Sequence, residues 1–244
     1  MRILAGGPTR DVNSDIYAAH LECLERQVFE GCTLEIRHFE LPDKGGPRWT
    51  REKMSRVGEV RQEFMDLAVA EEFDALFMVD DDLILGPNVL SELVRFSASV
   101  AYAVFLSDWP GLPRAPQVWD TNPYGRTSQL DASLTRDMGV LASDFGFEML
   151  TGTPRGVPVF GGGACTLIRG DGFRSRYSPT LQSLFNRGPG DMWAGEDRTF
   201  CLGLETRGIT QLAVVGLPVV HLDKPSKQTR EAVWEAKQMV GWSS

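Results

Sequence analysis

Short apolar runs alternate with longer amphipathic segments along the first 106 residues. The runs at 3–5, 75–79 and 100–105 are compact and apolar, which is typical of strands buried on both faces of a sheet. Apolar and polar positions alternate over 34–38 and predict a further strand. The first strand is expected to end at Gly6, because Gly6-Gly7-Pro8 has the composition of a turn.

Helices are predicted between these strands. Asn13 and Ser14 are suitable helix caps before apolar positions at helical spacing, and Pro87 is predicted at the first position of another helix. A third segment carries Val57 and Phe64 on one helical face. Because strands and helices alternate, this half predicts a parallel, doubly wound α/β arrangement, in which ligands bind at the carboxyl ends of the strands.

The pattern changes after residue 106. Residues 107–128 hold four prolines and two tryptophans with little periodicity, which predicts a long surface loop. Further strands are expected near 139–142, 145–150, 157–168 and 211–215, and helices over about 196–207 and 227–240. We expect a central, mostly parallel sheet flanked by helices, with a mixed second half. The predicted single domain, 1–244, divides into an α/β half at 1–106, a second half at 107–225 and a C-terminal helix at 226–244.

The composition is that of a folded globular protein and argues against some classes of protein. The 244 residues are 42% hydrophobic and 24% charged, which is ordinary for a folded chain, and the net charge of -8 argues against broad binding to nucleic acid. The four cysteines form no CxxC pair, so reduced, buried thiols are expected rather than a zinc ribbon. No apolar run is long enough to cross a membrane, and a cytoplasmic location is expected.

The strongest chemical signal is Asp80-Asp81-Asp82, which directly follows the apolar run at 75–79. Three adjacent carboxylates repel one another unless a cation compensates them. Oxygen-rich sites suit Mg²⁺ or Mn²⁺, and both ions also bind diphosphate oxygens. An acidic turn facing water is the alternative interpretation.

Three weaker signals follow later in the chain. Glu196-Asp197 is expected to open a helix, where acids are favoured by the helix dipole and where one of them is also a candidate general base. Gly161-Gly162-Gly163 would let the backbone approach a ligand closely, although a bulge is an alternative explanation. His221 follows an apolar run and, taken alone, is more often structural than a ligand.

Taken in this order, the motifs resemble a GT-A glycosyltransferase of the family-2-like branch. The shared pattern is an Asp-x-Asp after a hydrophobic strand, a Gly-rich strand, an acidic pair opening a helix, and a late histidine. The resemblance covers most of the chain, from about residue 2 to 224. It implies a GT-A-like nucleotide-diphospho-sugar transferase fold. In that fold the first half binds the nucleotide and the second half binds the acceptor and carries the catalytic groups.

The resemblance also implies roles for individual residues. Asp82, Asp80 and His221 would hold Mn²⁺ or Mg²⁺, and Asp197 or Glu196 would act as the catalytic base. The nucleotide and the donor sugar would be bound by Pro8, Thr9, Arg10, Arg61, Asp80, Asp81, Gly161, Gly162 and Gly163. The implied substrates are a nucleotide-diphosphate sugar and a hydroxyl acceptor, which is a saccharide, a lipid-linked sugar, a small molecule or a modified nucleic-acid base.

The chain departs from the family pattern in two places. Its first strand leads into Gly-Gly-Pro-Thr-Arg rather than a Pro-x-Tyr/His-Asn loop, and residues 107–128 match no part of the family pattern. A nucleotidyltransferase of similar fold, a metal-dependent phosphohydrolase, a non-catalytic nucleotide- or sugar-binding module and a structural protein with an acidic turn therefore stay as alternatives. The donor sugar, the base, the stereochemistry and the oligomeric state stay open.

Overall fold

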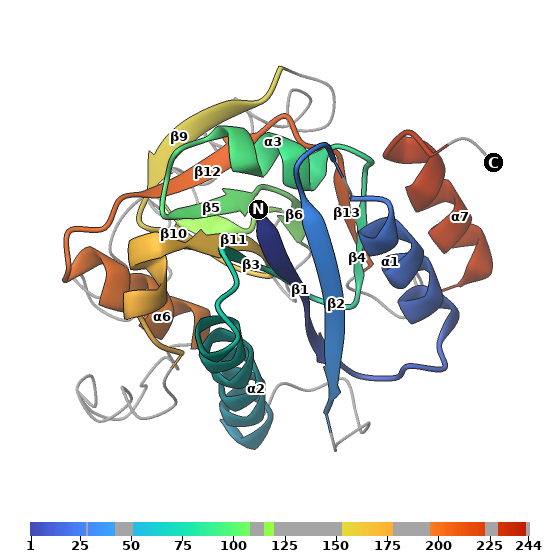
Figure 1. Cartoon of the computed structure of the whole chain (residues 1–244). Helices are drawn as coiled ribbons and strands as arrows, with labels where there is room; N and C mark the ends of the chain where they lie inside the picture. Colours follow the sequence, from blue (N-terminus) through green and yellow to red (C-terminus); the bar gives the residue numbers. More distant parts are fainter. Residues whose placement is uncertain are drawn as a thin grey trace.

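A central sheet forms the middle layer of the protein (Figure 1). The structure, a computed structural model, describes residues 1–27, 29–41, 51–107, 115–119, 153–177, 196–222 and 229–242. The strands of this sheet are β1 (Arg2–Thr9), β2 (Thr33–Glu40), β3 (Ala75–Val79), β5 (Val100–Ala103), β9 (Arg155–Val159), β11 (Cys165–Arg169) and β12 (Gln211–Val215). Shorter strands are β4 (Leu83–Leu85), β6 (Leu106–Ser107), β7 (Ala115–Pro116), β8 (Val118–Trp119), β10 (Gly161–Gly162) and β13 (Val219–His221). The helices are α1 (Asp15–Glu25), α2 (Arg51–Ala70), α3 (Val89–Arg95), α6 (Glu196–Glu205), α7 (Arg230–Met239) and a 3₁₀ turn at Gly170–Arg174.

Within the described residues, the strand order of the sheet is β2-β1-β3-β11-β5-β12-β9. Strands β2, β1 and β3 are mutually parallel, and β5 and β12 are parallel to each other. Strand β11 runs antiparallel to both β3 and β5, and β9 runs antiparallel to β12. The expected mostly parallel sheet with a mixed second half is thereby confirmed.

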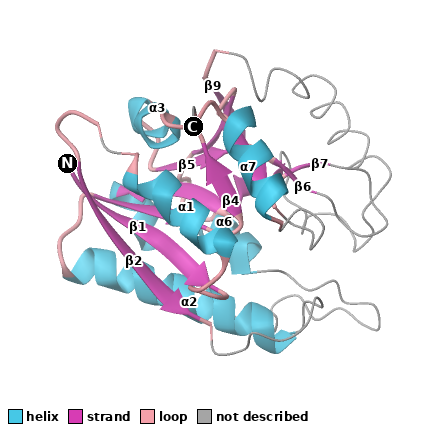
Figure 2. Cartoon of the chain, turned by 90° about the vertical axis from the view of Figure 1, so that its right-hand side faces the viewer, coloured by secondary structure: helices cyan, strands magenta, loops and turns pink. Residues whose placement is uncertain are grey.

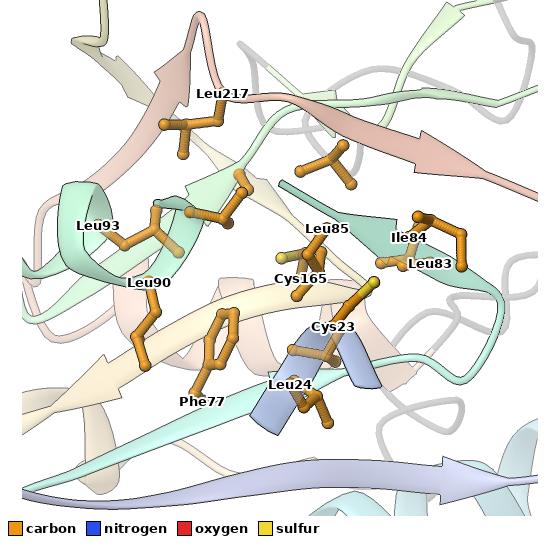
Figure 3. Packing of buried hydrophobic residues seen from close by; sticks show 14 of the residues in the cluster. Cys23, Leu24, Phe77, Leu83, Ile84, Leu85, Leu90, Leu93, Cys165 and Leu217 are labelled. Atoms are coloured by element: carbon orange, nitrogen blue, oxygen red, sulfur yellow. The ribbon is translucent and has the colours of Figure 1, made fainter. Parts of the chain in front are cut away.

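Two hydrophobic layers cover the two faces of the sheet. Alternation along β3 sends Phe77 to one face and Leu76 to the other, and all five side chains of this strand are buried. Helices α1, α3 and α7 pack with the first face, where Cys23, Leu85 and Cys165 lie in one apolar cluster (Figure 3). Helices α2 and α6 pack on the second face. Figure 2 shows α1 and α7 side by side, where Lys237 pairs with Glu22.

Several local predictions are confirmed. Ser14 caps α1 by accepting a hydrogen bond of 3.1 Å from the backbone N–H of Tyr17. The predicted strands at 75–79 and 211–215 have the predicted bounds. All four cysteines are buried free thiols, as expected.

The predicted end of the first strand was wrong, because β1 continues through both glycines to Thr9. Glycine is required at positions 6 and 7 because the neighbouring strands leave no room for a side chain, and not because the chain turns there. A Cβ on Gly6 would overlap the carbonyl oxygen of Arg37 in β2, and a Cβ on Gly7 would overlap that of Val79 in β3. Gly6 also has a φ of 140°, which other residues rarely adopt.

The first half is not the contiguous parallel unit that its strand–helix alternation predicts. Strand β11, from the second half of the chain, lies between β3 and β5 and pairs with both. Most of the expected loop at 107–128 and both predicted strands at 139–150 lie outside the described residues. In the part of the chain that the structure describes, no helix has both the length and the apolar character needed to cross a membrane.

Substitution Gly6→Ala is expected to lower the free energy of unfolding by about 3 kcal/mol or more, because strain and overlap act together at this position. Gly31→Ala is the matched control. Its φ is also positive, at 76°, but a Cβ there meets no atom within 4 Å, so only the backbone cost of about 1–2 kcal/mol is expected. Urea denaturation of the three proteins measures both values, and equal losses would contradict the overlap.

Candidate functional site

Three segments that are distant in sequence meet at one edge of the sheet. Because β1 and β3 are parallel, their carboxyl ends lie at the same edge, where they lead to Arg10 and Asp80. Strand β11 runs the other way and pairs Cys165 with Val79, so its amino end lies there too. Residues 161–163 therefore approach the acidic triplet. The backbone N–H of Asp80 donates to the carbonyl of Ala164 at 2.8 Å.

The turn before β11 contains an unusual backbone conformation. Ala164 has a φ of 64°, in the left-handed region. For a residue with a side chain this conformation costs on the order of 1–2 kcal/mol. Such outliers concentrate at functional sites, where the surrounding contacts hold them in place. Here the carbonyl of Ala164 accepts the hydrogen bond from Asp80.

A small two-stranded sheet brings His221 beside Asp82. Strand β13 pairs antiparallel with β4, and His221 lies opposite Leu83. The Nε2 atom of His221 is 3.3 Å from Oδ2 of Asp82. Its Nδ1 atom is 2.9 Å from the hydroxyl oxygen of Ser107, and its ring meets Phe105 edge-on at 5.2 Å between centroids. The ring is thus held in a defined orientation next to the carboxylate.

The guanidinium of Arg61 joins the acidic triplet to the acidic pair. It lies on α2 with only 3% of its side chain exposed. Its Nη2 donates to both oxygens of Asp80, at 2.7 and 2.9 Å. Its Nη1 donates to Asp197 and is 3.3 Å from Glu196. Burial lowers the pKa of Arg61, but the carboxylates of Asp197, Asp80 and Glu196 outweigh it and raise the pKa well above its usual value.

A second guanidinium, that of Arg10, binds the other two acids of the triplet. Asp81 accepts from the backbone N–H of Arg10 at 2.7 Å, and from its Nε and Nη2 at 2.9 and 2.7 Å. The same Nη2 is 2.8 Å from Oδ2 of Asp82. The acidic turn therefore does not simply face water. Its side chains are divided between two arginines, and Asp81 and Asp82 are nearly buried.

Carboxylates outnumber guanidinium groups among the described side chains of this cluster. Among its described side chains, five carboxylates (Asp80, Asp81, Asp82, Glu196 and Asp197) share the guanidinium groups of Arg10 and Arg61. Burial raises the pKa of Asp81 and that of Glu196. At Asp82 burial acts in the same direction, but His221 and Arg10 outweigh it and hold the pKa below its usual value. The excess of carboxylates is an environment that favours a bound cation.

The two acids of α6 point to different neighbours. A Cβ on Gly163 would overlap the carboxylate of Asp197, so Asp197 lies against the Gly-rich segment. The Cβ of Glu196 is 3.0 Å from the corresponding position on Gly58 of α2. The Asp197 side chain is 18% exposed and that of Glu196 is 9% exposed. Asp197 is thus the acid of this pair that faces the Gly-rich segment and the site.

The residues predicted to hold a metal fit that role in part. Asp82 and His221 are adjacent and present an oxygen and a nitrogen to the same space. Asp80 instead has both carboxylate oxygens bonded to Arg61. Within the described ranges, no group of three or more His, Cys, Asp or Glu side chains has a geometry suited to a metal ion. The pair Asp82 and His221 is therefore the part of the predicted ligand set that the fold brings together.

The fold brings some of the predicted nucleotide-binding residues to the site and buries others within the sheet. Pro8 and Thr9 are buried inside β1, and Arg10 is the first exposed residue after it. Arg61, Asp80, Asp81 and Gly161–Gly163 all lie at the site edge. Gly195, which precedes the acidic pair, and the side chains of Trp109, Trp119 and Tyr124 lie outside the described residues.

One contributor to the site is not indicated by the sequence pattern. His20 of α1 is buried, and its Nδ1–H donates to the carbonyl of Leu83 at 2.9 Å. Burial lowers the pKa of His20, which favours the neutral ring. This bond anchors the chain just after Asp82. A single histidine within an amphipathic helix carries no signal for such a role, because its partner is a backbone atom 63 residues away.

Comparisons with known proteins assign no family. No protein-family model matches the chain. No curated protein matches it either. A solved structure titled "Crystal Structure of A197 from STIV" is similar at 13% identity, covering 91% of this chain and 85% of that chain, with a TM-score of 0.47. A likeness of that size assigns neither a fold family nor an activity.

Replacing Arg61 with methionine is expected to cost about 3–5 kcal/mol of unfolding free energy, because the buried carboxylates lose their shared cation. The loss is measured by denaturation in buffer with a chelator, so that no metal ion can substitute. Arg56→Met, on the same helix but at an exposed ion pair with Glu59, is the control and is expected to change stability by less than about 0.5 kcal/mol. Similar values for both variants would contradict the central role of Arg61.

Proposed function

We propose that this protein is a glycosyltransferase with a GT-A-like fold. It would transfer a sugar from a nucleotide-diphosphate sugar to an acceptor hydroxyl, with a divalent ion on the diphosphate. The observation that carries the proposal is the meeting of Asp82 with His221, and of Asp80 with Asp197 through Arg61, at one edge of the sheet. These are the residues that the resemblance links to the donor, the metal ion and the acceptor.

The donor side of the proposal rests on charge. The hardest part of glycosyl transfer is the departure of a diphosphate that gains negative charge. Asp82 and His221 would hold Mn²⁺ or Mg²⁺, which supplies that neutralisation when bound. Of the two described arginines that bind the acidic triplet, Arg10 is the half-exposed one, and its guanidinium beside Asp82 is suited to contact phosphate oxygens. Asp80, 27% exposed and fixed by Arg61, is suited to hydrogen-bond the nucleotide ribose.

The acceptor side rests on the orientation of Asp197. A general base must contact the hydroxyl whose proton it takes. Asp197 lies against Gly163, in the segment proposed to line the donor-sugar pocket, whereas Glu196 is turned toward α2. We therefore assign the base role to Asp197 in an inverting reaction, and to Glu196 the role of supporting Arg61. Glycine at 163 is required because any side chain there would displace the Asp197 carboxylate.

Calorimetry with UDP, GDP, CDP and dTDP, each with and without Mn²⁺, tests the donor side. One of these nucleotides is expected to bind wild type in the presence of Mn²⁺, and Asp82→Ala is expected to weaken that binding at least about tenfold, equivalent to 1.4 kcal/mol. Asp171→Ala, at an exposed carboxylate, is the control and should bind like wild type. Absence of binding by wild type under every condition would refute the proposal.

The reaction products separate this function from its alternatives. A glycosyltransferase releases a nucleoside diphosphate from the nucleotide sugar, and a nucleotidyltransferase releases pyrophosphate from a nucleoside triphosphate and a sugar phosphate. A binding module releases neither. Ion-exchange chromatography of the two reaction mixtures identifies the products. Formation of pyrophosphate and a nucleotide sugar, with no nucleoside diphosphate released from added nucleotide sugar, would replace this proposal with the nucleotidyltransferase.

Asp197→Asn is expected to slow hydrolysis of the bound nucleotide sugar, with water as the acceptor, by about 100-fold or more, because the group that takes the proton is lost. Its affinity for the nucleoside diphosphate should stay within about threefold of wild type, a difference of less than 1 kcal/mol. Glu196→Gln is the comparison and should retain more of the hydrolysis rate. An unchanged rate in Asp197→Asn, or a larger loss in Glu196→Gln, would overturn the assignment.

A further inference from the structure

The two arginines of the site differ sharply in their access to solvent. The side chain of Arg61 is 3% exposed and lies beneath the cluster, whereas that of Arg10 is 47% exposed. Removing a buried guanidinium from its carboxylates leaves charges unpaired away from water, which is costly. The guanidinium of Arg10 is half-exposed and can exchange a carboxylate for water, whereas the buried carboxylate of Asp82 then needs another cation in its place. Arg61 is thus a permanent part of the site, and Arg10 is able to leave its partner.

Arg10 contacts Oδ2 of Asp82, the same carboxylate oxygen that would bind a metal ion. Oδ2 of Asp82 is 2.8 Å from Nη2 of Arg10 and 3.3 Å from Nε2 of His221. A divalent ion bound by Asp82 and His221 requires a ligand distance of about 2.0–2.2 Å to a carboxylate oxygen. The positive guanidinium and the positive ion cannot share this oxygen without repulsion. Binding of one therefore opposes binding of the other.

Asp81 keeps Arg10 at the site when the contact with Asp82 is lost. Its Oδ2 accepts the backbone N–H of Arg10, and its Oδ1 accepts both Nε and Nη2. The backbone bond does not depend on the position of the guanidinium. After release from Asp82, the guanidinium stays within reach of an anion bound to the metal ion. Asp81, the middle acid of the triplet, thus acts as a tether.

Resting on the proposed function, we propose that Arg10 is an exchangeable internal cation that competes with the divalent ion for Asp82. Without a nucleotide, Arg10 neutralises Asp82 and weakens binding of the free metal ion. When a metal-bound diphosphate binds, Asp82 and His221 would hold the ion, and Arg10 would move from Asp82 to the phosphate oxygens. The exchange makes metal binding depend on the nucleotide. When the contact between Arg10 and Asp82 breaks, the metal ion compensates Asp82 and the diphosphate compensates Arg10, so both are needed.

Mn²⁺ binding, followed by the electron paramagnetic resonance signal of free Mn²⁺, tests the competition without any turnover. Arg10→Ala is expected to bind Mn²⁺ alone about tenfold more tightly than wild type, which corresponds to 1.4 kcal/mol. With Mn²⁺ saturating, the same variant should bind the nucleoside diphosphate about tenfold more weakly. Arg10→Lys keeps the positive charge but lacks the planar guanidinium fork that spans Asp81 and Asp82, so its Mn²⁺ affinity should lie between those of wild type and Arg10→Ala.

Arg230→Ala is the matched control, because it removes one positive charge at an exposed pair with Asp15, away from the site. It should leave the Mn²⁺ affinity unchanged, which separates the local competition from a change in net charge. Adding Asp82→Asn to Arg10→Ala should abolish the gain. If wild type binds Mn²⁺ and neither Arg10 variant binds it more tightly, the exchange is refuted and the proposed function stands. If neither wild type nor the Arg10 variants bind Mn²⁺ alone, the exchange is refuted, whereas the proposed function fails only if wild type also binds none of the four nucleoside diphosphates in the presence of Mn²⁺.

Discussion

The buried guanidinium of Arg61 is the interaction on which the site depends. It lies on α2 and binds Asp80 at the end of β3 together with Glu196 and Asp197 at the start of α6. These acids would repel one another if they were brought together without a cation. Because the guanidinium is planar and has several donors, one side chain orients carboxylates from two distant segments. The spacing between Asp80 and the acidic pair of α6 is thus set by a residue of α2, a helix that contributes no acid to the site.

The sheet supplies the second constraint. Strand β11 is antiparallel between β3 and β5, and this reversal puts its glycine-rich approach beside the carboxyl end of β3. A parallel strand in that place would put the same residues at the opposite edge. Glycine then serves two different needs. Gly6 and Gly7 let β1 fit between neighbouring backbones, and Gly163 leaves room for the carboxylate of Asp197.

Arg61 and Arg10 neutralise different carboxylates of the cluster. Arg61 is buried and compensates charge permanently, while Arg10 is half-exposed and compensates Asp82 only as long as nothing stronger replaces it. This division resolves a difficulty that a metal site in an acidic turn always has. Carboxylates placed close enough to hold a cation must also be stable before the cation arrives. In the proposed exchange, a displaceable arginine would satisfy both conditions, because it stabilises the carboxylates before an ion binds and would yield to a bound anion–metal pair.

Much of the secondary structure and part of the site are determined by the sequence alone. The apolar run at 75–79, the Ser14 cap and the strand at 211–215 depend on local chemistry, so the pattern predicts them correctly. Asp80-Asp81-Asp82 could also be recognised from the sequence, because three adjacent acids directly after a buried strand are a local feature of the chain. Only the tertiary structure decided that β11 is inserted, that His20 anchors Leu83, and that Arg10 and Arg61 each take their own carboxylates. All of these features depend on contacts between segments far apart in the chain. Hydrophobic periodicity does not indicate which distant group a buried polar side chain will contact.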